Sequence, residues 1–295
     1  MLESESGGCF TVESLNQFEL LHKAAKDAGR KITVLLRLSS GNQFGLDKKD
    51  LIKLIVDYKD DEWIDFAGIQ FFSGTQKNSL KKVKREIDCL DQFIAELFEL
   101  YAFQVDKLEY GPGFPVSYFE GEQFEETEFL KEFSSMLDNM QYDGTIVLEL
   151  GRSIAASCGT YLTKVVDTKQ NNSELYAIVD GGMHQIVYYG QSMAMKQPKV
   201  RWLLKGEESE QQYWNICGSL CTINDFLVKR CPLPHLQTGD VLAFEKTGAY
   251  CVTEGISLFL SCELPGVVLM NETGEFTTVR EQTETEIFNA PQNFI

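Results

Sequence analysis

The chain has 295 residues, of which 43% are hydrophobic and 24% charged, and its formal net charge is −17. This apolar content supports a buried core, and the length suits one large domain or two ordinary ones. The acidity argues against a nucleic-acid partner because no basic stripe offsets it. No apolar run approaches the roughly 20 residues that cross a bilayer, so no membrane partner is expected.

The eight cysteines indicate a reducing compartment. None of them forms a Cys-x-x-Cys pair, and Cys217 and Cys221 have no second pair or nearby histidine to complete a zinc site. Residues 1–10 lack the basic start and the apolar run of a signal peptide. We therefore expect a cytoplasmic protein without a metal site, whose cysteines are mostly small buried groups.

Short apolar runs alternate with amphipathic segments up to residue 150. The expected strands are CFTVE (9–13), ITVLLRL (32–38), DFAGIQFF (65–72), DKLEYG (106–111) and TIVLEL (145–150). Helices are expected over 14–28, where Ser14 can cap the first turn, and over 79–101, where apolar residues share one face. Five βα units in a row predict a parallel sheet, either doubly wound or part of an eight-stranded barrel. Five strands are too few to close such a barrel.

After about residue 154, helical periodicity gives way to short β-rich segments that turn signals separate. These segments are 159–169, 174–182, 199–206, 213–218 and 239–250. The change of pattern predicts a first domain over residues 1–153 and a second, all-β domain over residues 154–295.

Small residues follow three of the expected strands, at the ends where function collects in a parallel barrel. These stretches are Ser73-Gly74-Thr75, Gly111-Pro112-Gly113 and Gly151-Arg152. Glycine lets backbone N–H groups approach an anion closely, and arginine offers a forked positive charge that suits phosphate. Together the three stretches predict a phosphate site.

Glu149 lies beside this expected phosphate site. A carboxylate there can hold a protonated ring nitrogen, and a phosphate with a pyridinium describes pyridoxal phosphate. A structural salt bridge between Glu149 and Arg152 explains the same spacing equally well.

Five motifs, in the right order, resemble those of the fold type III (alanine-racemase-like) pyridoxal-phosphate decarboxylases, which include the diaminopimelate and ornithine decarboxylases. They are GIQFFSGTQ (68–76), YGPGFPV (110–116), LELGRS (148–153), GSLCTINDFL (218–227) and TGAYCV (247–252). The third is similar to the family's Glu-Pro-Gly-Arg-Ser, with Leu150 in place of proline. The whole chain resembles the C-terminal two thirds of these enzymes. The implied fold class is α/β, a partial (β/α)₈ TIM barrel of about five βα units followed by a C-terminal β-barrel-like domain.

The resemblance also implies a pyridoxal 5'-phosphate site and roles for its residues. Glu149 would keep the ring nitrogen protonated, and Phe72 would replace the family's ring-stacking histidine. Cys221 would be the catalytic residue, which enters the partner subunit's site and helps to protonate the reacting carbon. The other cofactor ligands would be Thr75, Gly111, Gly113, Gly151, Arg152 and Tyr250. Because these enzymes are dimers with shared sites, a homodimer is implied.

The chain departs from the family at the Schiff-base lysine. Its first lysines, Lys23 and Lys26, fall inside the first expected helix, and the family's first three βα units have no counterpart. The segments 181–193 and 257–266 also lack the arginines that occur in the family at these places, so the resemblance implies no particular substrate. A small amino acid or a carrier-tethered aminoacyl group fits the family.

Three functions are compatible with these features. The leading one is a pyridoxal-phosphate-dependent amino-acid decarboxylase, present as a truncated product or as one half of a split enzyme whose companion chain supplies the lysine. The second is a non-catalytic, decarboxylase-like binding or regulatory protein, which the missing lysine fits directly. A racemase of the same fold is disfavoured because Glu149, and not an arginine, would face the ring nitrogen.

Overall fold

The computed structural model describes residues 8–203 and 210–291. The chain divides into two compact units, one of residues 1–115 and 124–153 and the other of residues 116–123 and 154–295. The boundary expected at residue 153 therefore omits residues 116–123. They belong to the second unit because Tyr118 and Phe119 pack into its core.

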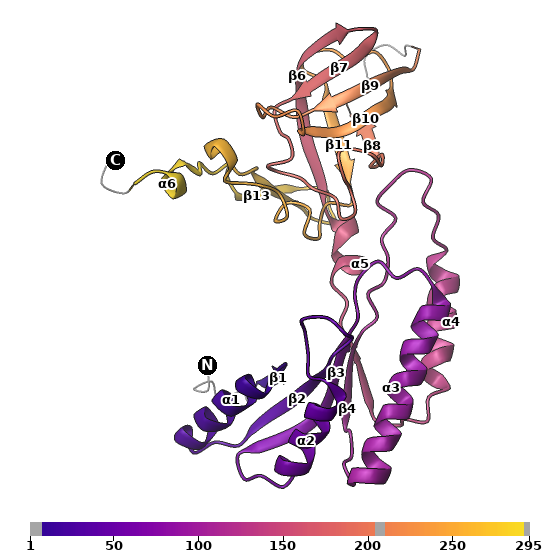
Figure 1. Ribbon diagram of the computed structural model, residues 1–295. Coiled ribbons are helices and arrows are strands. Elements are labelled where there is room, and N and C mark those ends of the chain that lie inside the picture. The colour runs from indigo at the N-terminus through magenta and orange to yellow at the C-terminus, as the bar shows by residue number, and fades with distance from the viewer. Residues whose placement is uncertain (1–7, 204–209, 292–295) are drawn as a thin grey trace. The chain divides into compact units, whose positions relative to one another are not determined.

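The first unit is a parallel sheet with the strand order β1-β2-β3-β4-β5, and four helices alternate with the strands (Figure 1). The strands are β1 (Cys9–Val12), β2 (Ile32–Leu38), β3 (Ile64–Phe72), β4 (Lys107–Gly111) and β5 (Thr145–Leu148). The helices are α1 (Leu15–Ala28), α2 (Lys48–Tyr58), α3 (Leu80–Tyr101) and α4 (Glu126–Asp138). Strand order follows chain order, as it does in a (β/α)₈ barrel, so the predicted partial barrel is confirmed.

Local chemistry explains why these elements begin and end where they do. The Ser14 side chain caps α1 by accepting from the Gln17 N–H at 3.1 Å, as predicted, and Gly29 ends the helix in the left-handed conformation. Helix α3 buries Val83, Ile87 and other apolar residues of one face against the sheet. Strand β5 ends at Leu148, two residues earlier than expected, so Glu149 lies just beyond the ladder.

Strands β1 and β5 are the two edges of this five-stranded sheet. The sheet does not close, in agreement with the strand count from the sequence. Val147 and Leu148 of β5 are each 37% exposed. An edge of this kind leaves a row of backbone groups available to a further strand.

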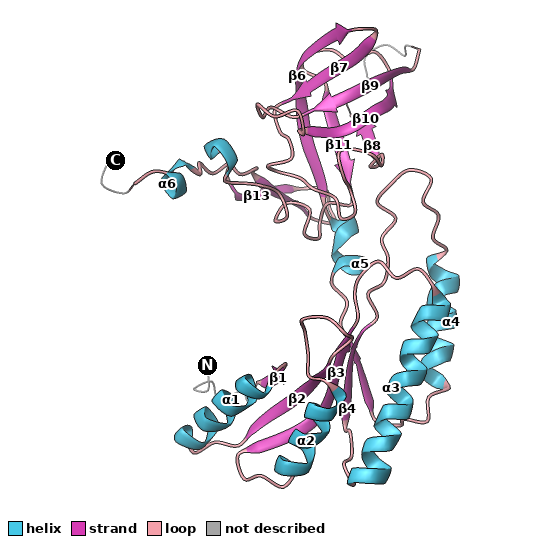
Figure 2. Ribbon diagram, in the orientation of Figure 1, coloured by secondary structure: helices cyan, strands magenta, loops and turns pink. Residues whose placement is uncertain are grey.

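The second unit contains the strands β6 to β13 (Figure 2). A six-stranded, mixed sheet has the order β10-β9-β7-β6-β11-β8, and β12 pairs with β13 separately. The strands are β6 (Thr160–Asn171), β7 (Glu174–Val179), β8 (Val200–Trp202), β9 (Gln212–Cys217), β10 (Phe226–Leu233), β11 (Val241–Glu245), β12 (Val267–Met270) and β13 (Phe276–Arg280). The last two and β10 were not expected from the sequence, and residues 204–206 of the expected strand 199–206 lie outside the described residues.

Among residues 8–203 and 210–291, no helix is both long and apolar enough to cross a membrane. The same residues contain no group of three or more His, Cys, Asp or Glu side chains that could hold a metal ion. Neither finding bears on how a bound organic group would be held.

Candidate cofactor site

A row of polar side chains crosses one face of the five-stranded sheet. Arg37 of β2 pairs in register with Gln70 of β3, and Gln70 pairs with Glu109 of β4. Residues paired in this way point to the same face of a sheet. That face is turned away from the helices, because the next residue, Tyr110, reaches the other way and donates to Glu86 of α3.

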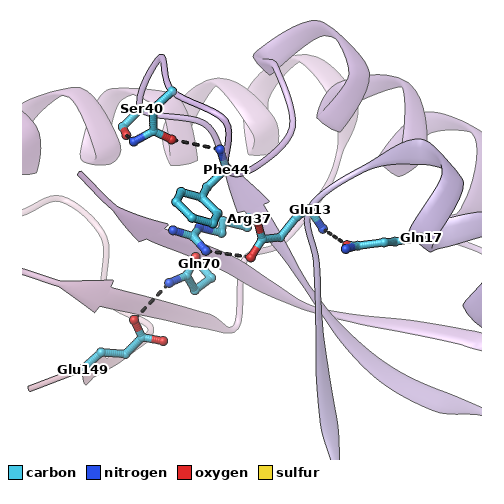
Figure 3. A network of polar contacts seen from close by, with 8 residues as sticks. Glu13, Gln17, Arg37, Ser40, Phe44, Gln70 and Glu149 are labelled. Atoms are coloured by element: carbon cyan, nitrogen blue, oxygen red, sulfur yellow. Dashed lines mark hydrogen bonds and ion pairs between the residues drawn. The ribbon is translucent and has the colours of Figure 1, made fainter. Parts of the chain in front are cut away.

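Hydrogen bonds connect two members of this row, Arg37 at one end and Gln70 in the middle, to glutamates, as Figure 3 shows. The Gln70 Nε2 donates to Glu149 Oε2 at 3.0 Å, and the Arg37 Nη1 donates to Glu13 Oε1 at 2.6 Å. Gln70 is only 4% exposed. Its Oε1 is buried and has no hydrogen-bond partner within the described residues, so an unfilled acceptor lies beside Glu149.

Glu109 and Glu149 share a hydrogen bond between their carboxyl groups. This bond, followed by partial burial and by the negative charge of Glu149, raises the pKa of Glu109 to about 7, although Lys107 opposes the rise. A hydrogen bond between two carboxyl groups requires one proton. Glu149 therefore accepts from the amide of Gln70, and the Glu109 carboxyl is a second donor when it is protonated, below a pH of about 7.

Two glycine turns meet at the carboxyl ends of β3 and β4. Gly113 has φ +64°, and a Cβ atom there would lie 1.9 Å from the carbonyl oxygen of Gly74. At Gly111, a Cβ atom would lie 2.6 Å from the ring of Phe72 and 3.3 Å from Glu149 Oε2. Around Gly74, by contrast, a Cβ atom would meet nothing within 4 Å. The turns are thus packed against each other on one side and open on the other.

The first unit brings several of the predicted site residues together. Phe72, Gly111 and Glu149 are in mutual proximity, and Gly113 contacts Gly74 of the neighbouring turn. Thr75 follows Gly74 directly. Gly151 and Arg152 follow Glu149, and Arg152 begins the short helix α5 (Arg152–Ala155). The Glu149 carboxylate accepts from Gln70 and interacts with the Glu109 carboxyl group, and the Glu149 backbone N–H donates to the carbonyl oxygen of Tyr110 at 2.9 Å.

Cys221 lies in the second unit, on an exposed loop between β9 and β10. The buried carboxylate of Asp225 organises this loop by accepting from the Leu220 N–H at 2.9 Å and from the Met183 N–H at 2.7 Å. A Cβ atom at Gly218 would lie 2.2 Å from Asp225 Oδ2, so only glycine fits there. The motif 218–227 therefore forms a rigid support for an accessible thiol.

Tyr250 is also in the second unit, in the turn that follows β11. Its side chain is 52% exposed, and its backbone has φ +66°, a conformation that non-glycine residues rarely adopt. Its carbonyl oxygen accepts from Glu254 N at 2.8 Å and from the Thr253 hydroxyl at 3.0 Å. The turn thus presents an aromatic side chain to its surroundings.

Sequence reasoning missed Arg37, Gln70 and Glu109 as members of the site. A signal was available, because each is a polar residue within an apolar strand and lies one or two residues before that strand ends. Alternation with period two places all three on the face opposite the helices. Only the register between strands shows that they form one row.

Comparison with known proteins gives the class. The sequence pattern of the family described as "Pyridoxal-dependent decarboxylase, C-terminal sheet domain" matches residues 17–248. The chain therefore belongs to the pyridoxal-dependent decarboxylase family. It is 24% identical over 309 aligned positions to the L-glutamyl-[BtrI acyl-carrier protein] decarboxylase of Niallia circulans, with 96% of this chain and 72% of that protein covered.

Diaminopimelate decarboxylases are further relatives. The enzyme of Helicobacter pylori (strain ATCC 700392 / 26695) is 26% identical, with 81% of this chain and 62% of that protein covered. A crystal structure of diaminopimelate decarboxylase from M. jannaschii in complex with L-lysine superposes with a TM-score of 0.84 at 21% identity, covering 97% of this chain and 70% of that chain. The likeness in structure supports the fold. The chain spans between 62% and 72% of the length of these relatives.

Two features of the first unit fit the cofactor that the family name implies. The open side of the Gly74 turn offers backbone room for a phosphate, and Gly113 and Gly111 allow the close approach of the neighbouring segments. Near Gly111, Glu149 offers carboxylate oxygens that would suit a protonated ring nitrogen, and Gln70 Oε1 is a further buried acceptor, without a hydrogen-bond partner in the described residues.

Proposed function

We propose that this chain provides the greater part of the cofactor site of a pyridoxal-phosphate-dependent amino-acid decarboxylase of the diaminopimelate/ornithine type. The observation that supports this most strongly is the position of Gly111, where a Cβ atom would lie 2.6 Å from the Phe72 ring and 3.3 Å from Glu149 Oε2. The Gly111 turn, which has no side chain, is thus next to an aromatic ring and a carboxylate. A flat ring with a positive charge and a phosphate, such as protonated pyridoxal phosphate, suits these neighbours.

In this proposal each residue has a separate task. Glu149 binds the protonated ring nitrogen, and Phe72 covers one face of the ring. The phosphate is bound by Thr75, Gly111, Gly113, Gly151 and Arg152. When bound, the cofactor supplies an electron-withdrawing ring that accepts the electron pair released as CO₂ leaves. The negative charge of Glu149 favours the protonated ring because it stabilises the positive charge on the nitrogen.

The open edges of the sheet lead us to propose that further βα units complete the barrel. These units carry the lysine that binds the cofactor covalently, and they belong to a longer form of this chain or to a companion chain. They pair with the exposed backbone of both β1 and β5. A parallel barrel of eight strands then surrounds the polar row of Arg37, Gln70 and Glu109.

We further propose a homodimer with shared sites, in which the second unit of one subunit contributes to the site of the other. Cys221 is the proton donor to the reacting carbon, and Tyr250 contacts the cofactor. The exposure of both residues, on turns that hydrogen bonds to Asp225 and to the Tyr250 carbonyl oxygen stabilise, supports this assignment. The substrate is a small amino acid or a carrier-tethered aminoacyl group. The name of the Niallia circulans relative supports the second choice.

Titration of the chain with pyridoxal phosphate tests this function. We expect saturable, reversible binding, and no strong lysine adduct after borohydride reduction of the chain alone. Absence of binding, or a strong adduct on a lysine of this chain, would contradict the proposal.

A second candidate is a non-catalytic, decarboxylase-like binding or regulatory protein. The two candidates are distinguished by adding a lysine-bearing βα segment from a relative to this chain and measuring CO₂ release. Release of CO₂ from an amino acid supports the enzyme, and cofactor binding without CO₂ release supports the regulator.

A further inference from the structure

Lys77 lies behind the two glycine turns with its side chain only 10% exposed. Its Nζ donates to Glu86 Oε2 at 2.7 Å and to Ser73 Oγ at 2.8 Å, and it lies 5.8 Å from the centre of the Tyr110 ring. Ser73 donates in turn to the other carboxylate oxygen of Glu86. The hydroxyl of Tyr110 donates to Glu86 Oε2 at 2.9 Å. Glu86 of α3 is therefore the common acceptor for three side chains.

This network connects both turns to one helix. Ser73 and Lys77 stand at the two ends of the segment that contains Gly74, and both bond to Glu86. The backbone N–H of Lys77 also donates to the carbonyl oxygen of Gly113 at 2.9 Å. A Cβ atom at Gly113 would lie 3.0 Å from the Lys77 Cε, so the lysine stem packs directly beneath that turn.

The network is not explained by stability alone. A lysine that loses its water requires a well-placed counter-ion, and a buried ion pair often adds little net stability relative to apolar residues of the same size. On the same helix, Lys84 and Asp88 form an exposed pair with side chains 58% and 59% exposed. Exposed pairs of that kind contribute little. The two pairs differ in their partners: Lys77 and Glu86 bond to residues of the turns, whereas the side-chain hydrogen bonds of Lys84 within the described residues are to Asp88.

We propose that Lys77 and Glu86 are positioning residues that hold the 73–77 and 111–113 turns at the separation that a phosphate group requires. The inference rests on the proposed function for the identity of the phosphate ligand. Because the ammonium and the carboxylate neutralise each other, the pair contributes geometry and no net charge to the turns. The phosphate itself contacts the backbone of the turns, and Lys77 acts on it only through them.

The test compares Lys77→Met and Glu86→Gln with Lys84→Met as the matched control. Affinities for pyridoxal phosphate and for pyridoxal, which lacks the phosphate, are measured on the full chain. We expect the first two variants to bind pyridoxal phosphate about tenfold more weakly or worse while their affinity for pyridoxal stays within about twofold. The control keeps both affinities. Unchanged binding of pyridoxal phosphate, or an equal loss for both compounds, would overturn the inference.

Amide hydrogen exchange provides a readout that does not need the cofactor. In Glu86→Gln, we expect the backbone amides of segments 73–77 and 111–113 to exchange faster than in the unaltered chain. Lys84→Met should leave these exchange rates unchanged. Equal exchange in Glu86→Gln and the control would exclude the bracing role. If the unaltered chain fails to bind pyridoxal phosphate, the proposed function fails, and the exchange result alone decides whether the pair positions the turns.

Discussion

Glu109 and Glu149 project from the carboxyl ends of neighbouring parallel strands, and their carboxyl groups share a hydrogen bond. Glu149 also accepts from Gln70, which is almost fully buried. The proposed ring-binding residue thus belongs to a hydrogen-bonded group of three. The proton held between the two carboxyl groups affects how much negative charge Glu149 presents.

The first prediction concerns pH. Because the pKa of Glu109 is raised to about 7 in the folded chain, folding favours its protonated form. Protonation of Glu109 therefore adds to the free energy of unfolding. This contribution is fully present below the ordinary glutamate pKa, and it is lost as the pH rises through 7. The shift corresponds to about 3 kcal/mol. Solvent screening of this partly exposed group reduces the expected effect to roughly 1 kcal/mol.

Urea unfolding at several pH values between 5 and 8 measures this effect. Glu109→Gln should flatten the fall in the free energy of unfolding over that range, because its amide donates to Glu149 without titrating. Glu128→Gln, at an exposed position of α4, should keep the pH profile of the unaltered chain. An identical profile in Glu109→Gln would show that the shared proton does not contribute.

The second prediction concerns the proposed ring contact of Glu149. In Glu149→Gln, the charge-assisted hydrogen bond to the ring nitrogen becomes a neutral one. Such a change costs about 1–2 kcal/mol, or roughly 5- to 30-fold in affinity. The dissociation constant of pyridoxal phosphate measures it, and Glu128→Gln should bind as the unaltered chain does. Unchanged affinity would remove Glu149 from the site.

The third prediction separates backbone strain from close packing at two glycines. Gly29 and Gly113 have φ values of +62° and +64°, but a Cβ atom meets nothing within 4 Å at Gly29 and lies 1.9 Å from the Gly74 carbonyl oxygen at Gly113. Gly29→Ala should lower the free energy of unfolding by about 1 kcal/mol, from strain alone. Gly113→Ala should cost at least about 3 kcal/mol, because the turns must separate as well. Urea unfolding compares them, and equal costs would contradict the close approach.

The fourth prediction concerns the loop that carries Cys221. The buried Asp225 carboxylate accepts from two backbone N–H groups, and an asparagine amide can accept only through its single oxygen. Asp225→Asn should therefore lower the free energy of unfolding by about 2–3 kcal/mol. Asp167→Asn, at an exposed position of β6, should change it by less than about 0.5 kcal/mol. A small effect at Asp225 would mean that the loop is held by other contacts.

Local sequence signals were sufficient for most of the first unit. The continuous apolar runs and the Ser14 cap identified the five strands and the first helix, because these features depend on near neighbours in the chain. Strand β10 was missed for a physical reason. It contains Lys229, Arg230 and Pro232, and its pairing with β9 is interrupted by register shifts, so its sequence shows no regular alternation.

The polar row could be predicted only in part. The sequence shows that Arg37, Gln70 and Glu109 interrupt apolar strands, but their alignment depends on the register between strands that are far apart in the chain. The bonds of Lys77 to Glu86 and Ser73 likewise depend on how α3 packs on the sheet. Residues 116–123 joined the second unit through Tyr118 and Phe119, a tertiary contact without a local signal.

The most direct test of the central claim is a crystal structure of this chain grown with pyridoxal phosphate. The account predicts the phosphate between residues 74–75, 111–113 and 151–152, with the ring nitrogen within hydrogen-bond distance of Glu149. A phosphate bound elsewhere, or a Glu149 that still contacts only Gln70 and Glu109 while the cofactor occupies another surface, would contradict it.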